Sequence, residues 1–181
     1  MPPDPSRHPL LHPSAAPLIL TLAFDAADQA RFDRLRTEHF PPALNHIPAH
    51  LALFHHLPGD DLPLIDAQLR TAAARHPPGP LQVTGLRSLG RGVAYTLASP
   101  PTTALRATLA RAWHDSLTAQ DRQGWRPHVT IQNKAATADA ARLLAAMQAV
   151  FTPFTVYATG LLLWHYRGGP WDPAGTYDFL A

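Results

Sequence analysis

The pattern of apolar and polar positions divides the chain into short strands and amphipathic helices. Runs that are apolar or that alternate at every second residue predict strands, and apolar residues spaced three and four apart predict helices. Segments rich in proline and glycine separate these elements. Strands are predicted at 18–24, 49–57, 81–89, 92–99, 128–132, 154–168 and 176–181. Helices are predicted at 25–40, 61–76, 100–120 and 136–151.

The order of these elements repeats once along the chain. Each half, about 25–99 and about 102–181, contains a helix, a short strand with a histidine, a second helix and a pair of strands. This order predicts an α+β fold with two pseudo-symmetric lobes. We expect each lobe to be a small, mostly antiparallel sheet with helices outside, and the lobes to face each other across a central cleft. Residues 17–181 are expected to form this single domain, and the proline-rich segment 1–16 a flexible tail.

Composition narrows the class of protein and of ligand. A chain of 181 residues that is 46% hydrophobic and 15% charged suits a globular domain with a sizeable core. The formal net charge is only +2, and Lys134 is the only lysine among 15 basic residues. Such an arginine-rich, mildly basic surface is compatible with an anionic ligand, but it lacks the dense basic stripe of a duplex-DNA binder.

The absence of cysteine excludes disulfides, cysteine-ligated zinc and thiol catalysis. The first residues have no cationic segment followed by an apolar run, so they do not resemble a secretory signal. The longest apolar runs are too short to span a bilayer. We therefore expect a cytoplasmic protein, not associated with membranes.

One stretch, "HIPAHLALFHHLPG", holds four histidines in eleven positions. Because side chains alternate along a strand, His50 and Ala52 share one face. The same alternation places His56, near the strand end, on the His50 face, and places His55 on the opposite face. A zinc site built from His46, His50 and His56 is an alternative. No acidic or cysteine partner at a diagnostic spacing accompanies these histidines.

A second stretch, "HVTI" at 128–131, has the same pattern of a polar and an apolar face. His128 and Thr130 share one face, and Val129 and Ile131 point the other way, toward helices. If the two halves pack about a pseudo-twofold axis, the polar faces of both histidine strands meet in one cleft.

These residues resemble the two-histidine phosphoesterase superfamily and, within it, the 2′-5′ RNA ligase family, which is cyclic phosphodiesterase-like. The motif of that family is His-x-Thr/Ser-x, present once in each half. The second copy, in "RPHVTIQNK", is intact and follows a matching "LTAQD", whereas the first copy, in "PAHLALFHHLPG", has Ala52 in place of Thr or Ser. The resemblance covers 17–181.

The resemblance implies acid–base catalysis by His50 and His128 without a metal or cofactor. One imidazole removes a proton from the attacking group and the other protonates the leaving ribose oxygen. Either histidine can take either role. The implied reaction hydrolyses, or reversibly ligates, 2′,3′-cyclic phosphate or 2′-5′ linked ends. The expected partner is an RNA end or a small nucleotide with a cyclic phosphate, bound by a monomer.

Five positions are candidates for substrate binding. Thr130 is expected to donate to the phosphate, and Arg126 and Lys134 lie on the same strand alternation. Tyr166 is the preferred rim residue for stacking on a base.

Position Ala52 lacks a hydroxyl, and a hydrogen bond to a charged group contributes about 1.5–3 kcal/mol. The alternative to a phosphoesterase is therefore a degenerate RNA- or nucleotide-binding protein whose catalysis is impaired. Further aromatic candidates for stacking are Tyr95, Trp125, Trp164 and Trp171.

Overall fold

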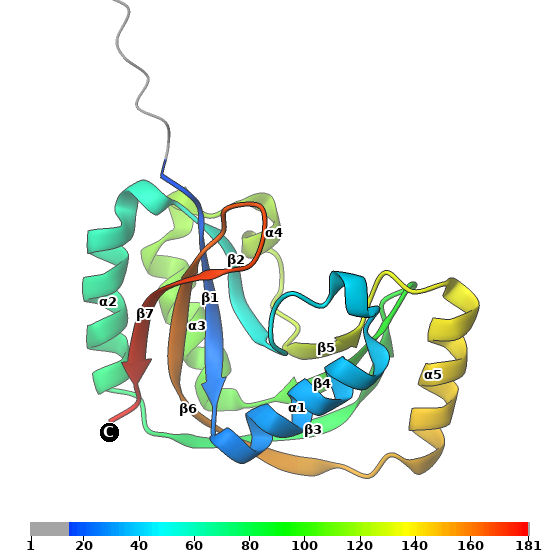
Figure 1. Cartoon of the computed structure of the whole chain (residues 1–181). Helices are drawn as coiled ribbons and strands as arrows, with labels where there is room; N and C mark the ends of the chain where they lie inside the picture. The colour runs from blue at the N-terminus through cyan, green and yellow to red at the C-terminus, as the bar shows by residue number, and fades with distance from the viewer. Residues whose placement is uncertain (1–14, 181) are drawn as a thin grey trace, which may run out of the picture.

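The structure, a computed structural model, describes residues 15–180, so most of the predicted tail lies outside the described residues. The predicted strands and helices follow one another in the predicted order, except that the helix predicted at 100–120 ends at Ala112 and two short helical segments follow it (Figure 1). The strands are β1 (Leu18–Phe24), β2 (Leu51–Leu57), β3 (Gly79–Ser88), β4 (Val93–Ala98), β5 (His128–Gln132), β6 (Phe154–His165) and β7 (Asp172–Asp178). The α-helices are α1 (Ala26–His39), α2 (Leu62–Ala74), α3 (Pro100–Ala112), α4 (Ala119–Arg122) and α5 (Thr137–Val150). Single turns of 3₁₀ helix are η1 (Pro42–Leu44), η2 (Gly59–Asp61) and η3 (His114–Ser116).

The strands form one antiparallel sheet in the order β2-β1-β6-β3-β4-β5, and β7 pairs with β6. Strand β6 joins the two lobes. Its later part, from Ala158 to His165, pairs with β1, and its first part, from Phe154 to Ala158, pairs with β3. The predicted α+β class, with antiparallel strands and helices outside, is confirmed, and the strands of the two lobes are continuous through β6.

The repeated unit is β-α-β-α-β, formed first by β1-α1-β2-α2-β3 and then by β4-α3-β5-α5-β6. When the two units are exchanged, the strand order reads the same from the opposite edge of the sheet, and the third strand of each unit joins the strands of the other. The predicted boundaries at 25–99 and 102–181 are therefore corrected. Strands β3 and β4 are neighbours along the chain and form a hairpin, so the sequence places them in one half although they belong to different units.

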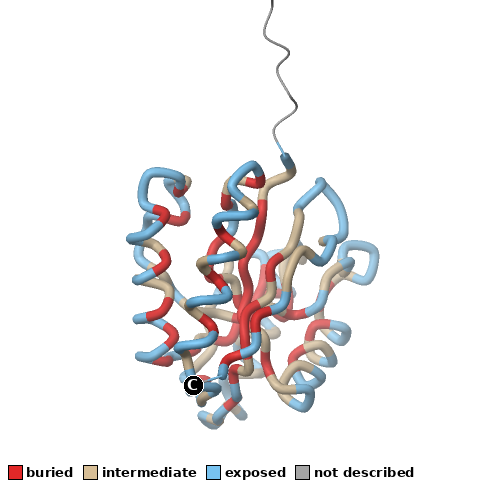
Figure 2. Tube along the Cα trace, turned by 90° about the vertical axis from the view of Figure 1, so that its left-hand side faces the viewer, coloured by how far each residue is buried: buried red, intermediate tan, exposed pale blue. Residues whose placement is uncertain are grey.

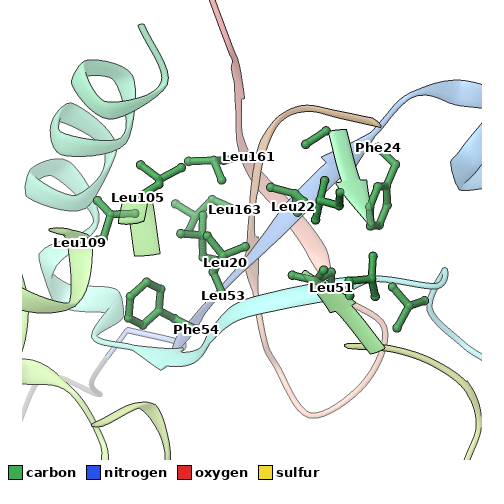
Figure 3. Close-up of a cluster of buried hydrophobic side chains, with 14 of the residues drawn as sticks. Leu20, Leu22, Phe24, Leu51, Leu53, Phe54, Leu105, Leu109, Leu161 and Leu163 are labelled. Carbon is green, nitrogen blue, oxygen red and sulfur yellow. The ribbon is translucent and has the colours of Figure 1, made fainter. Parts of the chain in front are cut away.

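Apolar side chains of β1 and β6 form the centre of the core. Figure 2 shows the buried strands in the middle of the molecule and exposed helix surfaces around them. Figure 3 shows Leu20 and Leu22 of β1 beside Leu163 of β6, with Leu105 and Leu109 of α3 to their left. Each fully buried leucine contributes roughly 1.5–3 kcal/mol to stability. This core stabilises the sheet to which the two histidine strands, β2 and β5, belong.

A buried arginine connects α1 to both histidine strands. Arg36 is only 4% exposed. Its Nε donates to Asn45 Oδ1 (2.8 Å) and Ile47 O (3.1 Å), and its Nη1 donates to Thr130 O (3.0 Å). The guanidinium also lies 3.9 Å from the centre of the Phe40 ring. The loop before β2 and the middle of β5 are thus held by one side chain, and Cα atoms of β2 and β5 lie within 8 Å of each other.

We predict that Arg36→Lys lowers the free energy of unfolding by about 3–5 kcal/mol, because a lysine ammonium cannot reach three acceptors and is left buried without full pairing. Urea denaturation measures the effect. Arg34→Lys, an exposed position on the same helix, is the control and is expected to change stability by less than about 0.5 kcal/mol. Equal unfolding midpoints for both variants contradict the role given to Arg36.

Candidate active site

His50 and His128 occupy equivalent positions at the starts of β2 and β5. His50 immediately precedes β2, and His128 is the first residue of β5. His50 Nδ1 donates to Pro48 O at 2.9 Å, and His128 Nδ1 donates to Arg126 O at 2.8 Å. A carbonyl oxygen only accepts, so both rings carry a proton on Nδ1 and present Nε2 for proton exchange.

The register of β2 against β1 shifts just after the histidine. Thr21 pairs with Ala52, but the next residue of β1, Leu20, pairs with Phe54. Leu53 is therefore an extra residue, as in a β-bulge. Leu53 and Phe54 are both 0% exposed, so two successive side chains point into the core. The side chains of β2 therefore stop alternating strictly between the two faces of the sheet after Ala52.

Strand β5 has the same irregularity at the same distance from its histidine. Ala94 pairs with Thr130, but Val93 pairs with Gln132, so Ile131 is the extra residue. Ile131 and Gln132 are both buried. The bulge three residues after each histidine is thus a feature that both units share.

The bulge in β2 reverses one prediction about the second pair of histidines. His55, and not His56, lines the cavity that contains His128. His56 lines a different cavity beside Pro17 and Leu117. The prediction that His56 shares the His50 face is wrong, because the extra residue at Leu53 moves the side chains that follow it by one position. A second register shift lies between Phe54 and Leu57.

The cavity around His128, here called cavity A, has a volume of about 590 Å³ and receives residues from both units. Its lining is polar and basic, with three arginines and two histidines, as expected for a site that binds an anion. The lining residues are Ala52, Leu53, His55, Arg87, Arg106, Gln120, Asp121, Gln123, Gly124, Trp125, Arg126 and His128.

His50 lines a neighbouring cavity of about 350 Å³, here called cavity B. Trp164 and Trp171 also line it, and the centre of the Trp171 ring lies 4.6 Å from the centre of the His50 ring. Ala52 lines cavity A and lies two residues from His50 on the same strand face. The two cavities are therefore adjacent along β2.

The surroundings of His50 favour its neutral form. Burial, followed by the charges of Arg36, His55 and His128, lowers its pKa to about 4, although the hydrogen bond to Pro48 O opposes this shift. His50 is consequently neutral at pH 7 and presents an unprotonated Nε2.

The pKa of His128 is also lowered. Burial is the largest cause, and the charges of Arg87 and His55 act in the same direction, against the hydrogen bond to Arg126 O. The charge of His55 thus acts on both strand histidines, and the charge of His128 also lowers the pKa of His50. These three imidazoles share one electrostatic site.

Of the residues predicted to bind substrate, the structure brings Ala52 and Arg126 to cavity A. Trp125 connects the two units there, because its Nε1 donates to Ala52 O at 2.9 Å. Thr130 is half-buried on the same strand as His128, and its carbonyl accepts from Arg36.

Two predicted binding residues lie elsewhere in the described structure. Strand β5 ends at Gln132, and Lys134 follows in an exposed turn with a φ of 59°. The bulge at Ile131 breaks the alternation that would have placed Lys134 on the His128 face. Tyr166 is 44% exposed, its N–H donates to Pro17 O, and it lines neither cavity A nor cavity B.

The other aromatic candidates divide into site and core residues. Trp164 lines cavity B and donates from Nε1 to Thr21 Oγ1 at 2.9 Å. Tyr95 is 7% exposed and packs against the rings of Phe32 and Phe154, so it belongs to the core.

Several residues of cavity A escape prediction from sequence. Arg87 belongs to β3 and is opposite Ala94, which in turn pairs with Thr130. Arg106 belongs to α3, whose sequence has no motif. Asp121 lies in "LTAQD", which the sequence marks only as the segment before the second motif. The pairing of β3, β4 and β5 is what brings Arg87 beside His128.

Within residues 15–180, no three histidine or acidic side chains are grouped so that they could hold a metal ion. The alternative zinc set of His46, His50 and His56 is therefore not assembled. None of the helices in the same range combines the length and apolar character needed to cross a membrane.

A family model for the 2′-5′ RNA ligase superfamily matches residues 24–170. The chain belongs to the 2′-5′ RNA ligase superfamily. This membership supports a phosphoesterase or RNA ligase type of function in general terms. Comparison with curated protein sequences gave no match.

Solved structures share the superfamily fold at low identity. The Thermus thermophilus protein TT0787 has 14% identity and a TM-score of 0.63, covering 91% of this chain and 98% of its own. E. coli LigT in complex with 3′-AMP has 19% identity and a TM-score of 0.60, covering 92% and 99%. A crystal structure described as a phosphoesterase has 19% identity and a TM-score of 0.62, with the same coverage. At these identities the likeness establishes the fold alone.

The lowered pKa of His50 predicts a pH-dependent stability. The unfolded chain binds a proton at this position below about pH 6.5, whereas the folded protein does so only near pH 4, so stability falls as the pH decreases between these values. We expect the free energy of unfolding of the wild type to lose about 2 kcal/mol more than that of His50→Asn between pH 7 and pH 5. Urea denaturation at both pH values measures this difference, with exposed His46→Asn as control. A loss in His50→Asn equal to that of the wild type would falsify the assignment.

Proposed function

We propose that the protein is a metal-independent phosphoesterase that hydrolyses, or reversibly ligates, 2′,3′-cyclic phosphate or 2′-5′ linked RNA or nucleotide ends. The observation that carries this proposal is the equivalence of His50 and His128. Each lies at the start of its strand with Nδ1–H bonded to the carbonyl two residues earlier, so each presents Nε2. Two such imidazoles can provide one base and one acid.

We assign the base to His50 and the acid to His128. His50 is neutral over most of the pH range because its pKa is about 4. Its Nε2 takes a proton from water, and the water oxygen forms a bond to phosphorus while the bond from phosphorus to the ribose O3′ breaks. Protonated His128 donates its Nε2 proton to that oxygen, which leaves a 2′-monophosphate. In ligation, a ribose hydroxyl of a second RNA end replaces water as the nucleophile. Its oxygen bonds to phosphorus while the same bond to O3′ breaks, which leaves a 2′-5′ linkage.

Donors around cavity A stabilise the charge on the phosphate during this reaction. Arg87 and Arg126 line the cavity. Thr130, which is not among the lining residues, lies two positions after His128 and carries the hydroxyl of the intact motif. Trp171, packed on His50, offers an aromatic face to a base.

The likeness to LigT supports a nucleotide-sized ligand. LigT was crystallised with 3′-AMP and with ATP. A volume of about 590 Å³ for cavity A lies within the range typical of small-molecule sites. We propose an RNA end or a small nucleotide as the substrate and a cytoplasmic monomer as the working form.

A second candidate function is nucleotide binding without turnover, and Ala52 is the observation that favours it. Incubation with adenosine 2′,3′-cyclic phosphate separates the two functions. Release of adenosine 2′-monophosphate supports the enzyme, and saturable binding without product supports the binding protein.

We predict that His50→Asn and His128→Asn each lower kcat for this substrate by about 10²–10⁴-fold, because each removes one proton-transfer group. His46→Asn, an exposed position in the loop before β2, is the control and retains activity. EDTA leaves the rate of the wild type unchanged. Complete loss of activity in EDTA that zinc restores would contradict the mechanism, and so would near-normal activity of either variant.

We also predict a bell-shaped dependence of kcat/KM on pH with an acidic optimum. Activity falls below about pH 4 because His50 gains a proton, and it falls again as the pH rises through the lowered pKa of His128, which lies below 6.5. Initial rates from pH 3.5 to pH 8.5 define both limbs. An optimum at pH 8 is incompatible with these roles.

A further inference from the structure

The first motif lacks a hydroxyl at Ala52, and the structure provides another donor nearby. We propose that His55 is a third histidine of the active site, which donates from Nε2–H to a phosphate oxygen of the substrate in place of that hydroxyl. The inference rests on the proposed function for the identity of the substrate, but its binding experiment does not require turnover.

The bulge in β2 directs His55 toward cavity A. Leu53 and Phe54 both enter the core, so the next residue, His55, returns to the face that Ala52 occupies. The side chain of His55 is 41% exposed and lines cavity A together with Ala52 and His128. A bulge beside an active site commonly re-aims a side chain in this way.

Asp121 fixes the orientation of His55. Its carboxylate accepts from the N–H of His55 at 3.0 Å, from the N–H of His56 at 2.9 Å and from His55 Nδ1 at 3.1 Å. Asp121 is 2% exposed. Burial opposes its ionisation, but these hydrogen bonds outweigh burial and hold the pKa of Asp121 below its ordinary value.

This arrangement leaves Nε2 as the nitrogen of His55 that can meet a ligand. Because Nδ1–H is bonded to Asp121, a second proton on the ring resides on Nε2, where it can be donated to an anion. The charge of His55 also contributes to the lowered pKa of both His50 and His128, which places its ring near both strand histidines.

The hydroxyl on the strand that pairs with β2 belongs to cavity B and not to cavity A. Thr21 is the cross-strand partner of Ala52, whereas the partner of Thr130 in the second unit is Ala94. Thr21 is 1% exposed, and its Oγ1 accepts from Trp164. Thr21 lines cavity B and not cavity A, so a phosphate in cavity A faces the side chain of His55 and not the hydroxyl of Thr21.

The test compares His55→Asn with His56→Asn. The asparagine amide at position 55 can still donate to Asp121 but has no atom in place of Nε2. We expect Kd for adenosine 2′-monophosphate, measured by calorimetry, to rise roughly 10–100-fold in His55→Asn and less than about twofold in His56→Asn. His55→Gln, whose amide nitrogen reaches toward the position of Nε2, is expected to retain part of the affinity. Its Kd tests the proposal if His55→Asn folds poorly.

Introducing Ala52→Thr tests the replacement of the hydroxyl directly. We expect this substitution to restore most of the affinity lost in His55→Asn but to improve the wild type much less, because the two donors serve the same phosphate. Equal affinity of His55→Asn and His56→Asn overturns the proposal, as does an equal gain from Ala52→Thr in both backgrounds. If the wild type binds this nucleotide through His55 but turns over no cyclic phosphate, the proposed function fails and the role of His55 stands.

Discussion

The site depends on how the buried Arg36 guanidinium holds the two edge strands of the sheet together. Strands β2 and β5 are the first and last in the strand order, so hydrogen bonds within the sheet do not join them. Arg36 reaches Ile47 O before β2 and Thr130 O within β5. Its buried charge also disfavours protonation of His50. One side chain thus serves both the geometry and the proton affinity of the site.

The paired bulges show how a repeated fold can produce two different halves. Both units insert an extra residue three positions after the histidine, so the polar face ends at the same point in each strand. After the bulge the sequences diverge. The first unit continues with His55, bound by Asp121, and the second ends at the buried Gln132. The duplicated backbone therefore gives equivalent positions to His50 and His128 and leaves the surrounding donors free to differ.

His50 and His128 have the same side chain but different surroundings, which affect the pKa of each ring. Both histidines bond a carbonyl through Nδ1, but His50 is packed under Trp171 and near Arg36, whereas His128 opens into cavity A beside Arg87. Burial and like charge favour the neutral ring, so the environment of each histidine sets its pKa, and the proposed roles of base and acid rest on this difference.

The sequence by itself determined the order of elements, the α+β class and the positions of His50 and His128, because strand and helix periodicity are local properties and the second motif is intact. It did not place Lys134 or His56 correctly relative to the site, because a bulge depends on how a strand pairs with its neighbour. Only the tertiary structure brought Arg87 to His128 and bound Asp121 to His55. These residues lie far apart along the chain. Arg87 reaches His128 because β3, the third strand of the first unit, joins the sheet of the second, and Asp121 reaches His55 because α4 packs against β2. No local pattern in the sequence reports either contact.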